Sequence, residues 1–140
     1  MSGGLTGITV DDACVTTFNE LKVRKAGRYV IFHIVNNATV NVAEVGPRET
    51  TFQQFVDKLG RDEPCYAVFD FEYNDGDVPR AKLLLLTWIP DTAKPKPKMV
   101  YASTAGALKA KIEGGLVEMQ ATDKSEITIE AVMHKIGGRR

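Results

Sequence analysis

Residues 65–88 read CYAVFDFEYNDGDVPRAKLLLLTW, and this stretch decides the fold. Cys65 to Tyr73 is rich in aromatic residues, which is typical of a buried strand. Asn74-Asp75-Gly76-Asp77 is a strong turn signal, and a second strand is expected from Arg80 to Trp88. The four consecutive leucines, Leu83 to Leu86, predict that the second strand is buried on both faces. It is therefore expected at the centre of a sheet with helices packed against each side.

The rest of the chain predicts four helices and three further strands. Hydrophobic residues recur with helical spacing after Asp11, after Thr50 or Thr51, after Pro97 and after Thr128, each of which can begin a helix. The further strands are expected at Arg28 to Val35, Thr39 to Val45 and Leu116 to Gln120. The order α-β-β-α-β-β-α-β-α predicts an α/β (α+β) fold, in which a central mixed five-stranded sheet is flanked by helices on both faces.

The chain has 140 residues, of which 44% are hydrophobic, enough for a substantial core. We expect a single domain over residues 1–140, with flexible ends at 1–8 and 137–140. No apolar run approaches the roughly 20 residues that span a bilayer, and the start shows no secretory signal. Cys14 and Cys65 lie in apolar stretches and are expected to be buried free thiols, which fits a reducing, cytoplasmic compartment.

The net charge is zero, but the charges are unevenly distributed along the chain. Glu44 to Asp77 carries nine acidic and three basic residues, a net charge of −6. Arg80 to Lys111 carries seven basic residues and one acidic residue, a net charge of +6. This asymmetry indicates a basic face that binds an acidic partner. The alternative is that the two sets of charges intermix on the folded surface.

The sequence contains no GxSxG motif, no glycine-rich phosphate loop and no HExxH motif, so we expect no enzymatic activity. Asp70 and Glu72 are the best candidates for acid–base catalysis, because they share one face of a strand. We favour the alternative that both lie on the rim of the sheet near a turn and pair with Arg or Lys on a neighbouring strand. His33 lies within a strand and is expected to be structural. No cofactor is expected, and the spacing of the two cysteines predicts no metal site.

The segment from Arg80 to Lys111 has the features of a contact surface. Arg80 and Lys82 are two residues apart on a strand and therefore share one face. Two prolines are expected to keep Lys94 to Lys98 extended and stiff. Stiffness lowers the entropy that is lost when a partner fixes these lysines.

The helix expected after this segment has two distinct faces. Its inward face should carry Tyr101, Leu108 and Ile112. Lys98, Ala102 and Lys109 cluster about 80° away, at roughly 100° per residue. Met99 and Gly106 flank this basic ridge, and a methionine can adapt its shape to a partner. The alternative is an ordinary solvated helix face.

Several motifs resemble those of the ADF/cofilin family. The matching segments are Gly7 to Asp12, Phe18 to Lys22, Tyr66 to Tyr73, Trp88 to Ala93, Lys96 to Thr104 with Leu108, and Val117 to Asp123. The segment Lys98-Met99-Val100-Tyr101 is the most specific of them. The resemblance covers nearly the whole chain.

This resemblance implies an ADF-homology fold and a protein that binds actin monomers and filaments. It also implies a preference for ADP-bound subunits and promotion of filament severing and depolymerisation. By position, a surface for both monomers and filaments would include Thr6, Gly7, Lys96, Lys98, Met99, Ala102 and Lys109. A second surface, for filaments alone, would include Arg80, Lys82, Glu130, His134 and Lys135. We expect a monomer in the actin cytoskeleton that does not bind nucleic acid.

The chain departs from the family pattern at two places. The position of the family's regulatory serine is Thr6 here, and the nearest serine is Ser2, so both are candidates for phosphorylation. A phosphate would add about −1.5 to −2 charges beside the basic helix. Ala105 stands where the family often has a basic residue, and Gly106 weakens the helix. We therefore expect weaker actin binding than in a strongly basic relative.

Two alternatives for the function remain open from the sequence. The same lysines could serve a peripheral module that binds phosphoinositide headgroups, and in the family this activity accompanies actin binding. A coactosin-like relative would bind filaments without severing them.

Overall fold

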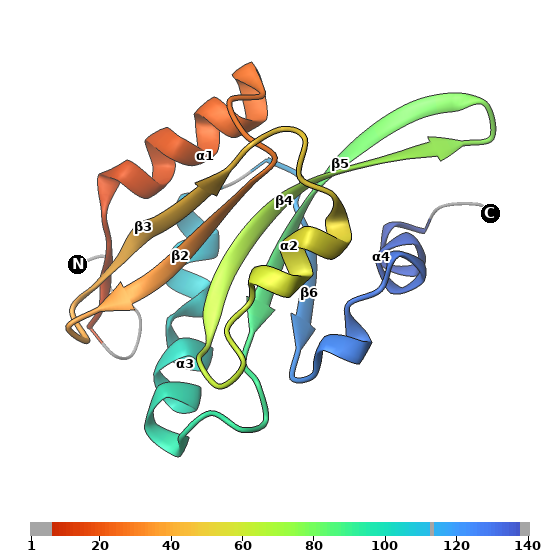
Figure 1. Cartoon of the computed structure of the whole chain (residues 1–140). Coiled ribbons are helices and arrows are strands. Elements are labelled where there is room, and N and C mark those ends of the chain that lie inside the picture. Colours follow the sequence, from red (N-terminus) through yellow and green to blue (C-terminus); the bar gives the residue numbers. More distant parts are fainter. Residues whose placement is uncertain (1–6, 113, 138–140) are drawn as a thin grey trace.

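The structure, a computed structural model, describes residues 7–112 and 114–137. Within these ranges, the strands form a single sheet and the helices pack against it (Figure 1). The strands are β1 (Thr9–Val10), β2 (Tyr29–Val35), β3 (Thr39–Gly46), β4 (Cys65–Asp75), β5 (Val78–Trp88) and β6 (Val117–Ala121). The helices are α1 (Asp12–Arg24), α2 (Phe52–Lys58), α3 (Pro95–Lys111) and α4 (Ile129–Ile136), with a short 3₁₀ turn at Lys124–Glu126.

The described residues form a six-stranded mixed sheet in the order β1-β3-β2-β4-β5-β6. The outer pairs β1–β3 and β5–β6 are parallel, and the other pairs are antiparallel. The fold class is therefore confirmed, but the sequence predicted five strands. The additional strand, Thr9–Val10, is too short to show a periodic pattern and forms only because it pairs with Thr39 and Val40 of β3.

The central pair is a long antiparallel hairpin that runs from Cys65 opposite Trp88 to Asp75 opposite Val78. Its far end projects beyond the rest of the sheet (Figure 1). β5 lies between β4 and β6, as the leucine run predicted, and Leu84, Leu85 and Leu86 are buried.

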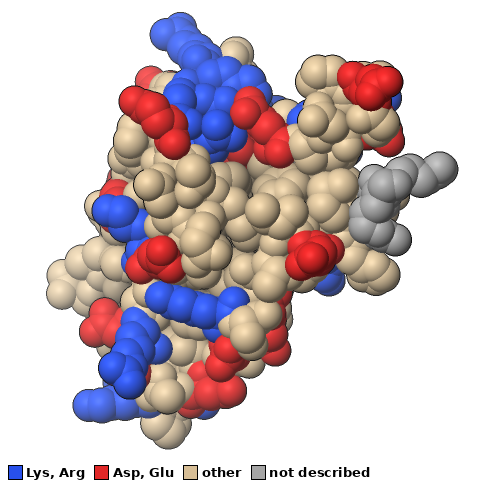
Figure 2. Space-filling model, turned by 45° about the vertical axis from the view of Figure 1, so that its right-hand side comes forward, with Lys and Arg blue, Asp and Glu red and all other residues tan. Residues whose placement is uncertain are grey.

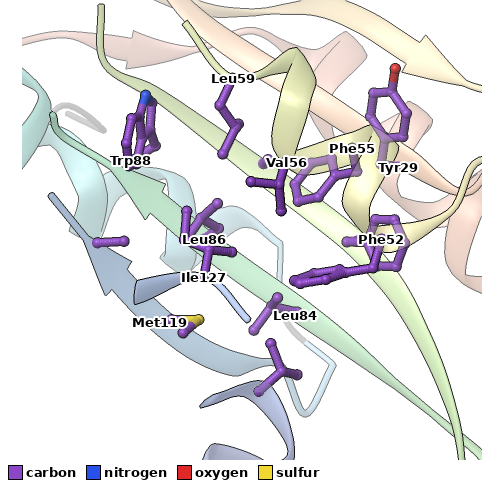
Figure 3. Packing of buried hydrophobic residues seen from close by; sticks show 14 of the residues in the cluster. Tyr29, Phe52, Phe55, Val56, Leu59, Leu84, Leu86, Trp88, Met119 and Ile127 are labelled. Carbon is purple, nitrogen blue, oxygen red and sulfur yellow. The ribbon is translucent and has the colours of Figure 1, made fainter. Parts of the chain in front are cut away.

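Each face of the sheet has its own hydrophobic core. On one face, side chains of α2 point toward those of β5 and β6, so that Phe52 and Val56 meet Leu84 and Leu86 (Figure 3). On the other face, the residues Cys14, Phe18 and Leu21 of α1 are buried together with residues of α3. The predicted arrangement, with helices on both faces, is confirmed.

Three predicted helix starts have the expected hydrogen bonds. The side chains of Asp11, Thr51 and Thr128 accept backbone N–H bonds within α1, α2 and α4, and Thr51 is thus the cap of α2 where the sequence left Thr50 and Thr51 open. Such bonds satisfy donors that the first helical turn leaves without partners. Each cap typically contributes about 1 kcal/mol to stability.

The prediction of an extended Lys94–Lys98 segment was wrong. Lys94 has extended backbone angles, but α3 already begins at Pro95. Proline fits the first turn of a helix because the missing N–H would have no partner there. The helical start places Lys96 and Lys98 on α3 itself.

Both cysteines are free and buried, as predicted. Burial raises the pKa of the Cys14 thiol to about 11 and that of Cys65 to about 12, so both thiols are protonated at neutral pH. Within the described ranges, no helix has the length and apolar character needed to cross a bilayer.

The ends of the chain were predicted to be flexible over 1–8 and 137–140. Residues 1–6 and 138–140 lie outside the described residues. Ile8 is buried against the α1 side of the sheet, so the ordered core begins no later than this residue.

Asp70 and Glu72 take part in a network of ion pairs. The Asp70 side chain is 1% exposed, and its Oδ2 lies 3.0 Å from Lys25 Nζ and 2.8 Å from Arg48 Nη1. Glu72 is half-exposed and pairs with Arg28 and Arg48 at 3.0 and 2.9 Å. The predicted pairing with basic residues is confirmed, but the prediction that both acids lie at the rim of the sheet and pair with a neighbouring strand was wrong, because Asp70 is buried and the partners lie outside the strands. The basic partners come from the segments before β2 and after β3, so the network ties both to β4.

Asp70 is buried and Glu72 is half-exposed, so neutralising the two carboxylates should lower the free energy of unfolding by different amounts. Asp70→Asn should lower the free energy of unfolding by about 2 kcal/mol, because a buried charge pair loses one partner and leaves the cations short of an acceptor. Glu72→Gln makes the same chemical change at a half-exposed site and should cost less than about 1 kcal/mol. Urea unfolding of both variants measures the difference, and equal losses would contradict this account.

Candidate functional site

The inward face of α3 fixes the helix to the sheet. Tyr101, Thr104 and Leu108 are buried. The Tyr101 hydroxyl accepts a hydrogen bond from the Ile34 N–H at 2.9 Å, and the Tyr66 hydroxyl donates to the Tyr101 carbonyl oxygen. Burial raises the pKa of both tyrosines. The helix is therefore held by hydrogen bonds to two different strands as well as by apolar packing.

The outward face of α3 carries the residues that the sequence singled out. We call Lys96, Lys98, Met99, Ala102 and Lys109 the α3 ridge. Lys98 is half-buried and the other four are exposed. The Met99 side chain is 64% exposed and presents an apolar surface next to the lysines of the ridge. Ala105 is half-buried and Gly106 is exposed, and a Cβ added at Gly106 would meet no atom within 4 Å.

Lys109 of the α3 ridge has a partner that the sequence did not predict. Its Nζ lies 2.8 Å from Glu118 Oε2 on β6, and both side chains are about half-exposed. Parallel pairing places Glu118 beside Leu85 of β5, whose side chain lies in the α3-side core. A sequence-based search could not find this pair, because it depends on how β6 is placed in the sheet.

Part of the first predicted surface lies at the N-terminus. Gly7 is exposed and has a positive φ of 76°. It precedes β1, and α3 contacts β1, so Gly7 is brought to the side of the molecule that carries the α3 ridge. Thr6 belongs to the same predicted surface, and Thr6 and Ser2 are the candidate phosphorylation sites. Both lie outside the described residues.

Arg80 and Lys82 of the second predicted surface lie on the projecting part of β5. Side chains alternate along a strand, so these two residues point to the same face as Leu84 and Leu86, which is the face covered by α2 and α4. Both are exposed. Arg80 Nε lies 3.4 Å from Asp75 Oδ2 in an exposed pair.

α4 supplies the other residues of this surface, and it lies on the same side as the projecting hairpin (Figure 1). Glu130 and His134 are exposed and four residues apart, so they share one helix face. Lys135 is also exposed but lies about 100° further round the helix. It lines a groove between α3 and β6 together with Lys109, so α4 contributes to both sides of the molecule.

The charge asymmetry of the sequence is partly cancelled by folding. Acidic Asp70 and Glu72 are paired with Lys25, Arg28 and Arg48, and basic Lys109 is paired with Glu118. Figure 2 shows Lys and Arg side chains beside Asp and Glu over much of the face that it presents. Near the start of α3, Lys94 and Lys96 are exposed.

His33 is exposed on β2 and lines a pocket of about 620 Å³ at the start of α3. Lys94, Lys96, Asp62 and Glu63 also line this pocket, so it carries charges of both signs. The described residues contain no group of three His, Cys, Asp or Glu side chains that could hold a metal ion.

Comparisons with known proteins match this chain over nearly its whole length. A family model described as cofilin/tropomyosin-type actin-binding protein matches residues 7–137. Actophorin of Acanthamoeba castellanii is 40% identical over 132 residues, which cover 94% of this chain and 96% of actophorin.

Solved structures agree with the sequence comparisons. The crystal structure of Streptomyces griseoflavus cofilin is 39% identical, with a TM-score of 0.83 over 92% of this chain and 98% of that one. The solution structure of ADF/cofilin from Trypanosoma brucei is 40% identical, with a TM-score of 0.75 over 97% of each chain. The matched range includes β1, the α3 ridge, the projecting hairpin and α4. The chain belongs to the ADF/cofilin family of actin-binding proteins.

Proposed function

We propose that this protein binds actin monomers and filaments and promotes filament severing and depolymerisation. The observation that carries the proposal is the outward face of α3. There, an exposed methionine lies between lysines on a helix whose other face is fixed to the sheet. Family membership supports actin as the partner, and we propose that the protein acts by binding and not by catalysis.

The α3 ridge has the composition of a protein-binding surface. Met99 offers an adaptable apolar contact at its centre, and methionine is enriched in interfaces. Ala102 and Gly106 are exposed and small, so a partner can approach the helix backbone closely. Lys96 and Lys98 add charges that attract an acidic surface. We propose that this ridge, with Gly7 and Thr6, holds one actin subunit.

The second surface differs from the first in position and in partner. Arg80 and Lys82 project from the hairpin on the α2–α4 face, and Glu130 and His134 lie on α4 on the same side. We propose that these residues, with Lys135, bind the adjacent subunit of a filament. A rigid protein that holds two neighbours at a fixed spacing stabilises the filament twist that fits it best. The change in twist is then a population shift driven by differential affinity.

The proposal also covers the oligomeric state, the cellular location, the preferred nucleotide state of actin and the regulation of binding. We propose that the protein is a monomer of the cytoplasmic actin cytoskeleton and prefers ADP-bound subunits. Anionic phosphoinositide headgroups would compete with actin for Lys96 and Lys98, because both ligands use the same charges. Phosphorylation at Ser2 or Thr6 would add negative charge near the ridge and weaken actin binding.

Loss of the ridge lysines should weaken binding to both forms of actin. Lys96→Ala/Lys98→Ala is expected to raise the Kd for monomers and filaments about tenfold, since each interfacial charge typically contributes about 1 kcal/mol or less when partly exposed. Lys22→Ala/Lys58→Ala removes two exposed lysines elsewhere and serves as the control. Co-sedimentation with ADP-actin filaments and a monomer-binding titration measure the two affinities. Equal effects of the two double variants would refute the role of the ridge.

Loss of the hairpin charges should separate filament binding from monomer binding. Arg80→Ala/Lys82→Ala is expected to weaken filament co-sedimentation about tenfold and leave monomer affinity unchanged, because only a filament presents the second subunit. A parallel loss of monomer affinity would contradict the assignment of two surfaces.

Imaging of single filaments tests the proposed activity itself. Filaments that shorten and break after addition of the protein would support severing and depolymerisation. Decorated filaments of unchanged length and number would instead indicate a coactosin-like binder.

A further inference from the structure

The Lys109–Glu118 ion pair lies on the surface that we propose for actin. The Nζ–Oε2 distance is 2.8 Å, and the exposed fractions of the two side chains are 56% and 52%. Within the described residues, no ion pair is formed by Lys96 or Lys98, the other two lysines of the α3 ridge. Lys109 therefore differs from them, because its charge is already compensated inside the protein.

Glu118 can reach Lys109 because buried and exposed side chains alternate along β6. Along this strand, Met119 and Ala121 are buried on one face, and Glu118 and Gln120 are exposed on the other. β6 is the last strand of the sheet, so Glu118 lies at the rim between the sheet and α3. The position of the carboxylate is thus fixed by the register of a strand and does not depend on a loop.

The pair also lies in a groove. A hollow of about 410 Å³ runs between α3 and β6, and Ala102, Ala105 and Gly106 line its helical wall. Lys135 of α4 lines it as well. Glu118 is the one acidic residue among the described residues that line this groove, and it lies among cations from both predicted actin surfaces.

We propose that Glu118 limits the affinity of the α3 ridge for actin by competing with the partner for Lys109. The inference rests on the proposed function. An acidic partner seated on the ridge would have to displace Glu118 from Lys109. The displaced Glu118 carboxylate would then lie against the negatively charged surface of the partner. Such like-charge contacts weaken binding and exclude partners that do not supply a compensating cation.

The exposure of the Lys109–Glu118 ion pair fits the proposed competition with actin for Lys109. Exposed ion pairs contribute little to stability and are screened by salt, so a partner can displace this one readily. Glu118 therefore lowers the affinity without blocking the surface. It provides a second reason, besides Ala105 and Gly106, to expect weaker binding than in a strongly basic relative.

A double-mutant cycle tests the competition directly. Glu118→Gln keeps the shape of the side chain and removes its charge. Lys109→Gln removes the positive charge for which Glu118 and actin are proposed to compete. The double variant combines both changes. Glu20→Gln, an exposed position on α1, is the control for net charge. Affinity for actin monomers and the association rate are measured for all variants at low and at physiological salt.

We expect Glu118→Gln to bind about three- to tenfold more tightly than the wild type, with most of the change in the association rate and a smaller change at higher salt. Glu20→Gln should bind like the wild type. In the Lys109→Gln background, removal of the Glu118 charge should tighten binding less, because only the like-charge contact is relieved and Lys109 is no longer there to compete for.

Two results would overturn the inference. If Glu118→Gln has the same affinity as Glu20→Gln, Glu118 does not limit binding. If Glu118→Gln tightens binding equally with and without Lys109, the effect is general repulsion and not competition for one lysine. In both cases the wild type still binds actin, so the proposed function stands. A wild type that binds no actin would overturn the proposed function and this inference together.

Discussion

The antiparallel register between β4 and β5 determines which residues of the two central strands face each other on each side of the sheet. Eleven consecutive residues of each strand pair, from Cys65–Trp88 to Asp75–Val78. Because side chains alternate along a strand, this register assigns every residue of the pair to one of two faces. Leu84, Leu86 and Trp88 enter the core under α2 and α4, and Leu85 enters the core under α1 and α3. A slip by one residue would exchange the two sets.

The same alternation extends from the cores to the candidate surfaces. Arg80 and Lys82 continue the series of Leu84 and Leu86, so they must face the side of α4. Glu118 pairs in register with Leu85, so it must face the side of α3. One structural constraint therefore separates the proposed contacts with two actin subunits and brings an acidic residue to one of them.

The sequence was sufficient for much of the fold and for only part of the site. Strong local signals, such as the leucine run of β5 and the caps at Asp11 and Thr128, predicted the main elements correctly. β1 was missed because its two residues depend on pairing with β3, and the start of α3 was misjudged because proline fits both an extended segment and a first helical turn. The Lys109–Glu118 pair could not be predicted, because no local pattern tells which residue of β6 lies opposite α3. The assignment of residues to two actin surfaces stays a prediction.

Electron cryo-microscopy of ADP-actin filaments decorated with this protein would test the central claim most directly. The claim is that the two surfaces contact two adjacent subunits of one filament. The account predicts density for Met99 and the rest of the α3 ridge on one subunit, density for Arg80 and Lys82 on its neighbour, and a filament twist that differs from that of bare filaments. Density that places both surfaces on a single subunit, or a decorated filament with unchanged twist, would contradict it.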